Sequence, residues 1–186
     1  MHEPTTGERS WEVLGQQMLL ERQPWLEVYQ EQVKLPTGRV LDDFYRVVLP
    51  HFAVIVPVTP EGHVVMVRGY KHGVGRVSLS PPAGLLHPGE AAADAARREL
   101  LEETGYSAGE WRCLGSYVVD GNRQCGTMHA FLAYNARPAR EPEPDDTEDL
   151  QVEVLSRARL VESLTRGEFG SLAAMAAVTL ALTVGL

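Results

Sequence analysis

Three features of the sequence predict one α/β (α+β) domain with a mixed β-sheet. The apolar run His51–Thr59 (HFAVIVPVT) is rich in β-branched residues, which is typical of a central buried strand. The alanine-rich run Ala91–Leu101 predicts a helix, because alanine has the highest helix propensity. The other predicted strands and helices follow one another without strict βαβ alternation, which favours a mixed sheet.

Length and charge limit the classes of protein to which the chain can belong. Its 186 residues fit one domain with a small appendage, and its net charge of −8 argues against nucleic-acid or anionic-membrane partners. The most apolar segment, 171–186, is shorter than the roughly 20 residues that span a bilayer. The N-terminus lacks the basic and apolar regions of a signal peptide, so we expect a cytoplasmic protein.

The two cysteines, Cys113 and Cys125, match no zinc or redox spacing. Free thiols in a reducing compartment are the expected state, and a disulfide between them is the alternative.

Residues 1–47 are expected to form an N-terminal extension built on a β-hairpin. Its first part, 11–29, carries scattered apolar side chains without helical or strand periodicity. The predicted elements are strands at 27–33 and 39–48 around a turn at 35–38. Such a hairpin serves either as a dimerisation arm or as an extra layer on the same sheet. The main domain is expected to span 48–186.

The remaining elements of the main domain follow from apolar runs and turn residues. Further strands are predicted at 63–70, 77–80, 111–119, 129–134 and 150–155, and C-terminal helices at 159–164 and 171–186. Ser171 is the expected N-cap of the last helix. Residues 136–149 contain three prolines and six acidic residues, a composition that is typical of a solvated linker.

The segment Gly84–Tyr106 carries four glutamates at fixed spacing. Glu99, Glu102 and Glu103 lie at i, i+3 and i+4 of the predicted helix, so their side chains share one face. Like charges at this spacing cost about 0.2–0.5 kcal/mol per pair. A bound divalent cation would offset that cost, and Mg²⁺ usually takes one or two carboxylates. A solvated acidic helix face is the alternative, but it leaves the flanking glycines unexplained.

The spacing across this segment resembles the motif of the Nudix hydrolase family. Five residues separate Gly84 from Glu90, seven separate Glu90 from Arg98, and Arg98 begins the run RELLEETGY. Every fixed position of the Nudix box is present over 23 residues, and a looser resemblance extends from about Val40 to the C-terminus. The resemblance implies a Nudix-type α/β/α sandwich with a mixed β-sheet and an N-terminal β-hairpin extension.

The resemblance also implies roles for the residues of the motif. Glu99 and Glu103 are implied to bind a metal ion, Mg²⁺ or alternatively Mn²⁺, with Glu102 close by and the backbone carbonyl of Ala83 as a further ligand. Together with a carboxylate near the attacking water, such a site hydrolyses a diphosphate. The other motif residues are implied to be structural: Gly84 and Gly105 at tight turns, and Glu90 and Arg98 as a tie between the helix and its preceding loop.

Stretches outside the motif resemble the ADP-ribose pyrophosphatase and nucleoside-diphosphate-sugar hydrolase branch of the family. They are LPTGRVLDDFYRVV, AVIVPVTPEGHVVMVRGYK, PPAGLLHPGE and HAFLAYNA. In that branch a basic residue meets the substrate phosphates. Here the candidate is Lys71, with Arg68 and Arg46 as further candidates, and a simple charge at a strand end is the alternative for each.

The branch also places a catalytic acid in the loop before the last strand, here at Glu148 or Asp146. This changes the interpretation of residues 141–149 from a linker to a mobile acidic loop that closes over the substrate. Enzymes of the branch are homodimers in which N-terminal strands of one subunit cover the other's site. Trp11, Trp25 and Tyr29 are then candidates for the interface or for stacking on a base, with core packing as the alternative.

Two departures from the branch pattern leave the substrate open. Ser80 stands where many relatives carry glutamate, and Gly121 stands where the ADP-ribose-specific subgroup often has proline. The expected reaction is hydrolysis of a nucleoside diphosphate sugar, with ADP-ribose giving AMP and ribose 5-phosphate as the first candidate. The alternatives are GDP-mannose or another sugar nucleotide, a dinucleoside polyphosphate or oxidised nucleoside triphosphate, and a non-catalytic Nudix-like sensor of a nucleotide sugar.

Overall fold

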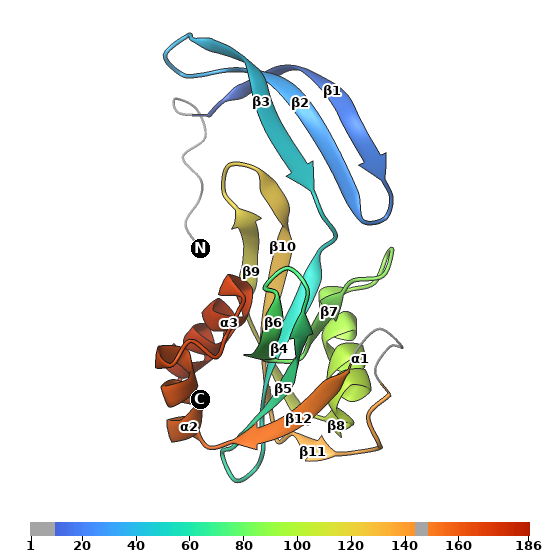
Figure 1. The fold of residues 1–186 in the computed structure, drawn as a ribbon, viewed down its shortest axis with the longest axis vertical. Coiled ribbons are helices and arrows are strands. Elements are labelled where there is room, and N and C mark those ends of the chain that lie inside the picture. The colour runs from blue at the N-terminus through green and yellow to red at the C-terminus, as the bar shows by residue number, and fades with distance from the viewer. Residues whose placement is uncertain (1–9, 144–148) are drawn as a thin grey trace. The chain divides into compact units, whose positions relative to one another are not determined.

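The computed structural model describes residues 10–143 and 149–186 (Figure 1). The chain divides into two compact units. Of the described residues, the first unit comprises those up to Pro50 together with Val118–Gly126, and the second comprises His51–Tyr117 and those from Thr127 to Leu186.

The first unit is an antiparallel sheet in the order β1-β2-β3. Its strands are β1 (Glu12–Arg22), β2 (Leu26–Lys34) and β3 (Val40–Val48). The predicted hairpin corresponds to β2 and β3, whereas β1 falls where no strand was expected. A half-buried strand is recognised in a sequence by alternating apolar and polar residues. Every residue of β1 is exposed, so the strand has no buried face that would require this alternation.

The second unit contains the main core. Its strands are β4 (Phe52–Val58), β5 (Val64–Lys71), β6 (Arg76–Ser80), β7 (Ala83–Leu85), β8 (Tyr106–Ser107), β9 (Glu110–Asp120), β10 (Gln124–Tyr134), β11 (Arg137–Pro138) and β12 (Leu150–Leu155). Its helices are α1 (Ala92–Thr104), α2 (Arg157–Thr165) and α3 (Leu172–Thr183). The tip of the β9–β10 hairpin belongs to the first unit.

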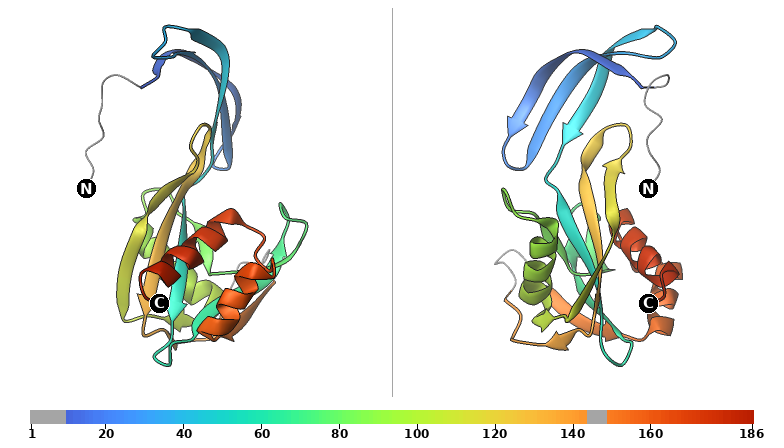
Figure 2. Two further views of the ribbon diagram at one scale, coloured as in Figure 1. Left: turned by 90° about the vertical axis from the view of Figure 1, so that its left-hand side faces the viewer. Right: turned by 180° about the vertical axis from the view of Figure 1, so that it is seen from behind.

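The sheet of the second unit is mixed, as the sequence predicted. Strand β4 pairs in parallel with β10 and antiparallel with β5 and β7, and β5 pairs antiparallel with β6 and β12. Helix α1 lies on one face of this sheet, and α2 and α3 lie on the other (Figures 1 and 2). The predicted α/β/α sandwich is therefore confirmed.

Strand β4 is buried on both faces, and alternate residues of it serve two separate cores. Ala53 and Ile55 pack against Ala95 and Ala96 of α1. The other face of β4 joins a larger core, whose members include Val54, Val56, Leu160, Ala174, Ala177 and Val178. The small alanine side chains of α1 and α3 let both helices approach the sheet closely. This explains why the two alanine-rich segments pack on its opposite faces.

Residues 137–143 are exposed, as their composition predicted, but part of this segment is paired. Strand β11 pairs with β8, which begins at Tyr106, the last residue of the motif. Ser171 is at the N-cap position of α3, as predicted, but its side chain makes no capping hydrogen bond.

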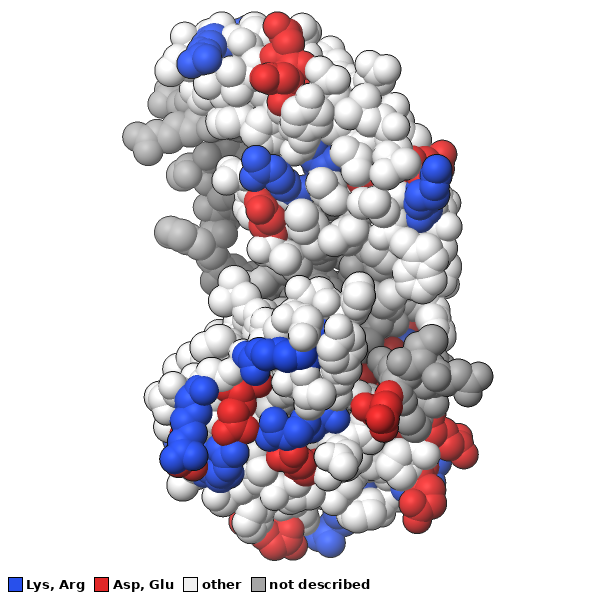
Figure 3. All heavy atoms as spheres, in the orientation of Figure 1, with Lys and Arg blue, Asp and Glu red and all other residues white. Residues whose placement is uncertain are grey.

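Surface charges of both signs are interspersed. On the face drawn in Figure 3, Lys and Arg alternate with Asp and Glu over the second unit. Cys113 and Cys125 are free thiols. Over residues 10–143 and 149–186, no helix is both long and apolar enough to cross a membrane.

Candidate active site

Helix α1 is positioned by its alanine face, which leaves its glutamates beside strand β7. Ala95 and Ala96 are fully buried against the sheet. Strand β7 is fixed in turn by β4, with Ala83 opposite Val54 and Gly84 opposite Ala53. Strand β4 therefore anchors the helix, the first motif residue Gly84 and Ala83 directly before it.

Two of the predicted metal-binding carboxylates lie against β7. Glu99 and Glu103 are buried, with 9% and 2% of their surface exposed. The backbone N–H of Ala83 donates a 3.0 Å hydrogen bond to Oε2 of Glu103. A Cβ on Gly84 would lie 2.1 Å from Cδ of Glu99. The structure thus brings Ala83, Gly84, Glu99 and Glu103 together.

The tight turn expected at Gly84 is instead a strand. Gly84 lies within β7, and its φ is not in the left-handed region. Glycine is needed here because the Glu99 carboxylate approaches the backbone, and any side chain would collide with it.

Arg98 offsets much of the repulsion among the helix carboxylates. Its Nη1 atom lies 2.6 Å from Oε1 of Glu99 and 3.1 Å from Oε2 of Glu102. The side chain of Glu102 is more exposed than those of Glu99 and Glu103. Part of the charge compensation that the sequence attributed to a cation is therefore supplied by the chain itself.

The same arginine ties α1 to the loop before it. Nε and Nη2 of Arg98 donate bonds of 2.9 and 3.0 Å to the two carboxylate oxygens of Glu90, and Nη2 also reaches the carbonyl of Leu85. The backbone N–H of His87 donates to Glu90 at 2.8 Å. Bonding to Arg98 lowers the pKa of Glu90 to about 2, and these carboxylates raise the pKa of Arg98.

The C-terminal end of α1 is bonded to the segment that enters the acidic stretch. Gly105 adopts a left-handed conformation with φ of 72°, and its N–H caps the helix on Leu101. Its carbonyl accepts bonds from the N–H groups of Ala139 (2.8 Å) and Arg140 (3.1 Å), and the carbonyl of Glu102 accepts one from Glu143 (2.8 Å). The predicted catalytic acids Asp146 and Glu148 lie outside the described residues.

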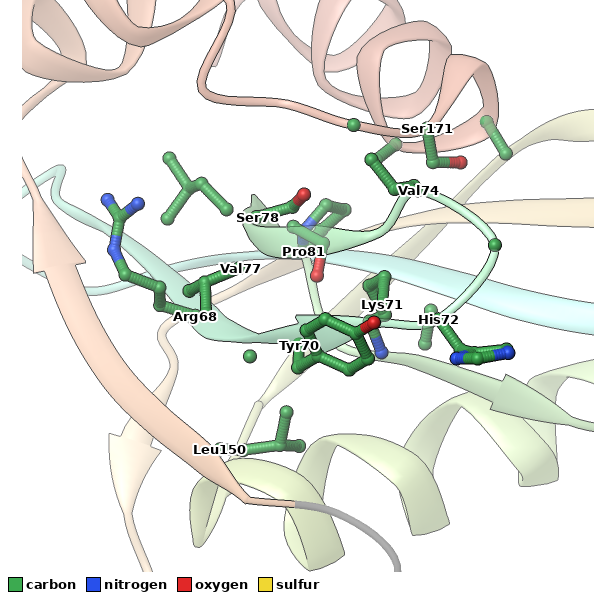
Figure 4. Close-up of a pocket in the computed structure, with 18 of the residues that line it drawn as sticks. Arg68, Tyr70, Lys71, His72, Val74, Val77, Ser78, Pro81, Leu150 and Ser171 are labelled. Carbon is green, nitrogen blue, oxygen red and sulfur yellow. The ribbon is translucent and has the colours of Figure 1, made fainter.

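A pocket of about 790 Å³ opens beside β7 (Figure 4). Ala83 and Lys71 both line it, together with Tyr70, Asp149 and the start of α3. Lys71 forms no ion pair with any residue in the described part of the chain. Its amino group is therefore available to an anionic ligand.

Arg68 lines the same pocket as Lys71 (Figure 4) but is held in ion pairs, whereas Arg46 belongs to the first unit. Arg68 pairs with Glu153 and with Glu168, the latter at 2.9 Å, and both carboxylates raise its pKa. In the first unit, Arg46 bonds Glu31 at 2.6 Å and Gln124 at 3.1 Å and stacks over the ring of Tyr29. Of the three predicted basic residues, Lys71 and Arg68 therefore line one pocket of the second unit.

The three aromatic residues singled out in the N-terminal region are also in the first unit. The ring of Trp11 packs edge-on against Phe44 with centroids 5.3 Å apart, and Trp25 is 63% exposed. The hydroxyl of Tyr29 donates to Glu27 at 2.7 Å.

The donor set suits a hard divalent cation. Within the described residues, no three His, Cys, Asp or Glu side chains form a cluster that could hold a metal as they stand. Two carboxylates and the Ala83 carbonyl provide hard oxygen donors in the number that Mg²⁺ takes from proteins. The residues present therefore fit such an ion.

The sequence predicts Ser171 as a helix cap but does not place the start of α3 in a pocket. The structure shows that Gly170 and Ser171, just before α3, and Ala173 and Ala174 in its first turn all line the pocket. The sequence signal for this site is Gly170-Ser171 directly before an apolar helix. The serine indicates a helix start, and the glycine indicates that another part of the chain lies close to the backbone there.

Comparison with known families gives two matches. Residues 49–175 match the NUDIX domain, and residues 11–47 match the nucleoside diphosphate sugar hydrolase N-terminal domain.

Individual relatives agree with these matches. The chain is 31% identical to an ADP-ribose pyrophosphatase of Bacillus subtilis over 74% of this chain and 76% of that protein. It is 32% identical to an ADP-ribose pyrophosphatase of Mycobacterium tuberculosis over 80% of this chain and 72% of that protein. A solved structure of an ADP compounds hydrolase superposes with a TM-score of 0.79 at 23% identity, covering 97% of this chain and 96% of that one, which shows a shared fold.

Proposed function

This chain belongs to the NUDIX domain family, and from that premise we propose that it hydrolyses the diphosphate of a nucleotide sugar, with ADP-ribose as the first candidate. Water adds to one phosphorus, the P–O–P bridge breaks, and ADP-ribose yields AMP and ribose 5-phosphate. The observation that carries the proposal is the placement of the Glu99 and Glu103 carboxylates against Ala83 and Gly84 beside the pocket. The names of the two bacterial relatives support ADP-ribose as the substrate.

Members of the family need divalent cations, and we propose Mg²⁺, with Mn²⁺ as a substitute. Glu99, Glu103 and the Ala83 carbonyl would hold it, and a bound ion would neutralise diphosphate oxygens and lower the pKa of a bound water. The chain's own contributions are positional. Arg98 orients Glu99 and Glu102, and Glu90 holds Arg98 in place.

Substrate binding is assigned to the pocket of the second unit. Lys71 is the proposed phosphate contact, because its charge is not neutralised by a described residue and it shares the pocket with Ala83. Arg68 lines the same pocket and is the alternative contact, although its Nε and Nη2 atoms are bonded to Glu153 and Glu168. Asp146 or Glu148 is proposed to position the attacking water.

The decisive experiment combines purified protein and Mg²⁺ with ADP-ribose, GDP-mannose, other sugar nucleotides, a dinucleoside polyphosphate and an oxidised nucleoside triphosphate. We expect ADP-ribose to give the highest kcat/KM, and Glu103→Gln to abolish turnover while the protein stays folded. Folded protein that turns over no member of this panel would contradict the proposal. Calorimetric binding without product would then favour a sensor.

We further propose that residues 1–47 form a dimerisation extension and that 48–186 form the catalytic domain. The boundary is supported by the two family matches, which end at 47 and begin at 49. Strand β1 exposes the apolar side chains of Val13, Leu14, Leu19 and Leu20. Contiguous exposed apolar surface often marks a protein–protein interface, which supports a role of this strand in dimerisation. Sedimentation velocity should give twice the mass of one chain, and Leu14→Glu with Leu19→Glu should halve it. A monomeric parent protein would refute the dimer.

A further inference from the structure

The pocket that contains Lys71 and Ala83 has a second polar end, where α3 begins. Gly170 and Ser171 line this end, opposite Ser78 of β6. Figure 4 shows the hydroxyl of Ser78 directed to the side of Val74 and Ser171. The Lys71 side chain points the other way.

Ser78 has a buried hydroxyl that no group of the described chain satisfies. The residue is 2% exposed, and its Oγ is the buried side-chain oxygen for which the described residues provide no hydrogen-bond partner. Such groups are rare in folded proteins because the lost hydration is not repaid. A Cβ added to Gly170 would lie 2.5 Å from this oxygen, so the absence of a side chain at 170 preserves the space beside it.

The start of α3 provides hydrogen-bond donors at the same place. The first N–H groups of a helix have no partner within the helix, and the helix dipole makes this end partly positive. The Ser171 side chain makes no capping bond, and the first turn of α3 contains no acidic residue. By contrast, Ser156 caps α2 by accepting from the N–H of Arg159. Helix α3 is therefore left open to an anion.

We propose that Ser78, Ser171 and the first turn of α3 form an oxyanion subsite that binds one phosphoryl group of the substrate. Both the hydroxyl of Ser78 and the helix N–H groups donate, and both favour a negatively charged oxygen acceptor. The pocket volume of about 790 Å³ is sufficient for a nucleotide-sized ligand that also reaches Ala83. That the bound phosphoryl group belongs to the substrate rests on the proposed function, whereas binding of inorganic phosphate to the subsite does not.

Val74 controls access to the subsite. A Cβ on Gly170 would lie 2.7 Å from Cγ1 of Val74, so the valine side chain packs over the same space. Val74 sits at the tip of the β5–β6 hairpin between Gly73 and Gly75, and Gly75 has φ of 72°. Phosphate binding requires the valine to turn aside, which this hairpin tip permits.

The first test places a carboxylate in the subsite. Ser171→Asp should cap α3 and keep the protein folded, but its charge should weaken binding of inorganic phosphate by about tenfold or more. Ser156→Asp adds the same charge at the start of α2 and should leave the affinity unchanged. Phosphate binding is measured by calorimetry on the full chain in EDTA, so that no metal-bound phosphate contributes. Equal effects of both variants, or none from Ser171→Asp, would overturn the subsite.

The second test removes the hydroxyl alone. Ser78→Ala should weaken phosphate binding about tenfold and raise the KM for ADP-ribose, while its Tm stays equal or rises because an unpaired polar group is lost. Ser107→Ala, at an exposed position in β8, is the control and should match the parent protein. Phosphate affinity and KM unchanged by Ser78→Ala would overturn the proposal and indicate that a trapped water satisfies the hydroxyl.

The two proposals fail in different ways. If no nucleotide sugar is turned over but Ser78→Ala and Ser171→Asp still lose phosphate binding, the subsite stands and the proposed reaction falls. If ADP-ribose is hydrolysed but the parent protein binds no phosphate in EDTA, the reaction stands and the subsite falls.

Discussion

The carboxylate of Glu99 occupies the space that any side chain on Gly84 would need. All three carboxylate atoms lie within 2.1 to 2.3 Å of the position that a Cβ on Gly84 would take. The observed position of Glu99, the first glutamate of the motif helix, therefore requires glycine at position 84. Their separation of fifteen positions follows from how α1 folds back over β7.

Gly84→Ala should reduce kcat strongly, because the new methyl group must push the Glu99 carboxylate out of place. Displacement of a catalytic group by about 1 Å costs on the order of 100-fold in rate. The control is Gly109→Ala, where a Cβ would meet its nearest atom at an ordinary 3.8 Å. Steady-state kinetics at saturating Mg²⁺ give the comparison, and equal kcat values for the two variants would contradict the role of Gly84.

Gly105→Ala should destabilise the protein more than Gly62→Ala does. The φ angle is 80° at Gly62 and 72° at Gly105, and such a left-handed conformation costs an L-residue about 1 kcal/mol or more. Only at Gly105 would the added Cβ also meet a backbone atom, the Arg140 oxygen at 2.2 Å, whereas Gly62 has open space. Urea unfolding should show losses of about 1 kcal/mol for Gly62→Ala and roughly 2–4 kcal/mol for Gly105→Ala. Similar losses of unfolding free energy in the two variants would show that backbone strain alone causes the destabilisation and that the contact with Arg140 adds nothing.

The ion pair of Glu90 with Arg98 predicts a loss of stability in acid. The pKa of Glu90 is about 2 in the folded chain and 4.5 in the reference state. Between these values the unfolded state binds more protons, so the stabilisation is complete above pH 4.5 and is lost as the pH falls toward 2. Glu90→Gln should therefore lose less stability than the parent protein between pH 5 and pH 3, measured by urea unfolding.

The control for this pH dependence is Asp94→Asn, which removes a carboxylate from the exposed side of the same helix. It should lose stability over this pH interval to the same extent as the parent protein. A Glu90→Gln profile that parallels the parent would show that the pair does not contribute.

Lys71→Met and Arg68→Met should separate binding from stability. Lys71 has no described ionic partner and lines the pocket, so its loss should raise KM about tenfold with little change in the free energy of unfolding. Arg68 bonds Glu153 and Glu168. Glu168 keeps its 2.6 Å bond to Arg159, but Glu153 would lose its described partner, so the loss of Arg68 should cost about 1–3 kcal/mol. Kinetics and urea unfolding on both variants provide the measurements. A raised KM for Arg68→Met at unchanged stability would instead place Arg68 at the substrate.

The elements that bury one face or both could be predicted from the sequence. Strand β4 and helix α1 combine strong propensity with clear burial patterns, and β12 was predicted at its observed bounds, 150–155. Strand β1 could not be predicted, because its exposed residues carry no periodic signal. The short β8 and β11 depend on each other across 30 positions, so neither is visible in its own local sequence.

The motif predicted which residues gather at the candidate site, but not why each is there. Spacing alone could not show that Gly84 makes room for Glu99, or that Arg98 bridges Glu99 and Glu102. The commitment of Arg68 to Glu168 depends on a contact one hundred positions away, which no local pattern records. The same holds for the buried hydroxyl of Ser78 beside Gly170.

The backbone bonds at the end of α1 tie the motif helix to a segment that follows it much later in the chain. Ala139 and Arg140 bond the carbonyl of Gly105, and Glu143 bonds the carbonyl of Glu102. Leu150, further along, packs its side chain on the bare backbone of Gly69, which lines the pocket. A substitution at 139–143 would therefore act on the end of the motif helix, and one at Leu150 would act on the wall of the pocket.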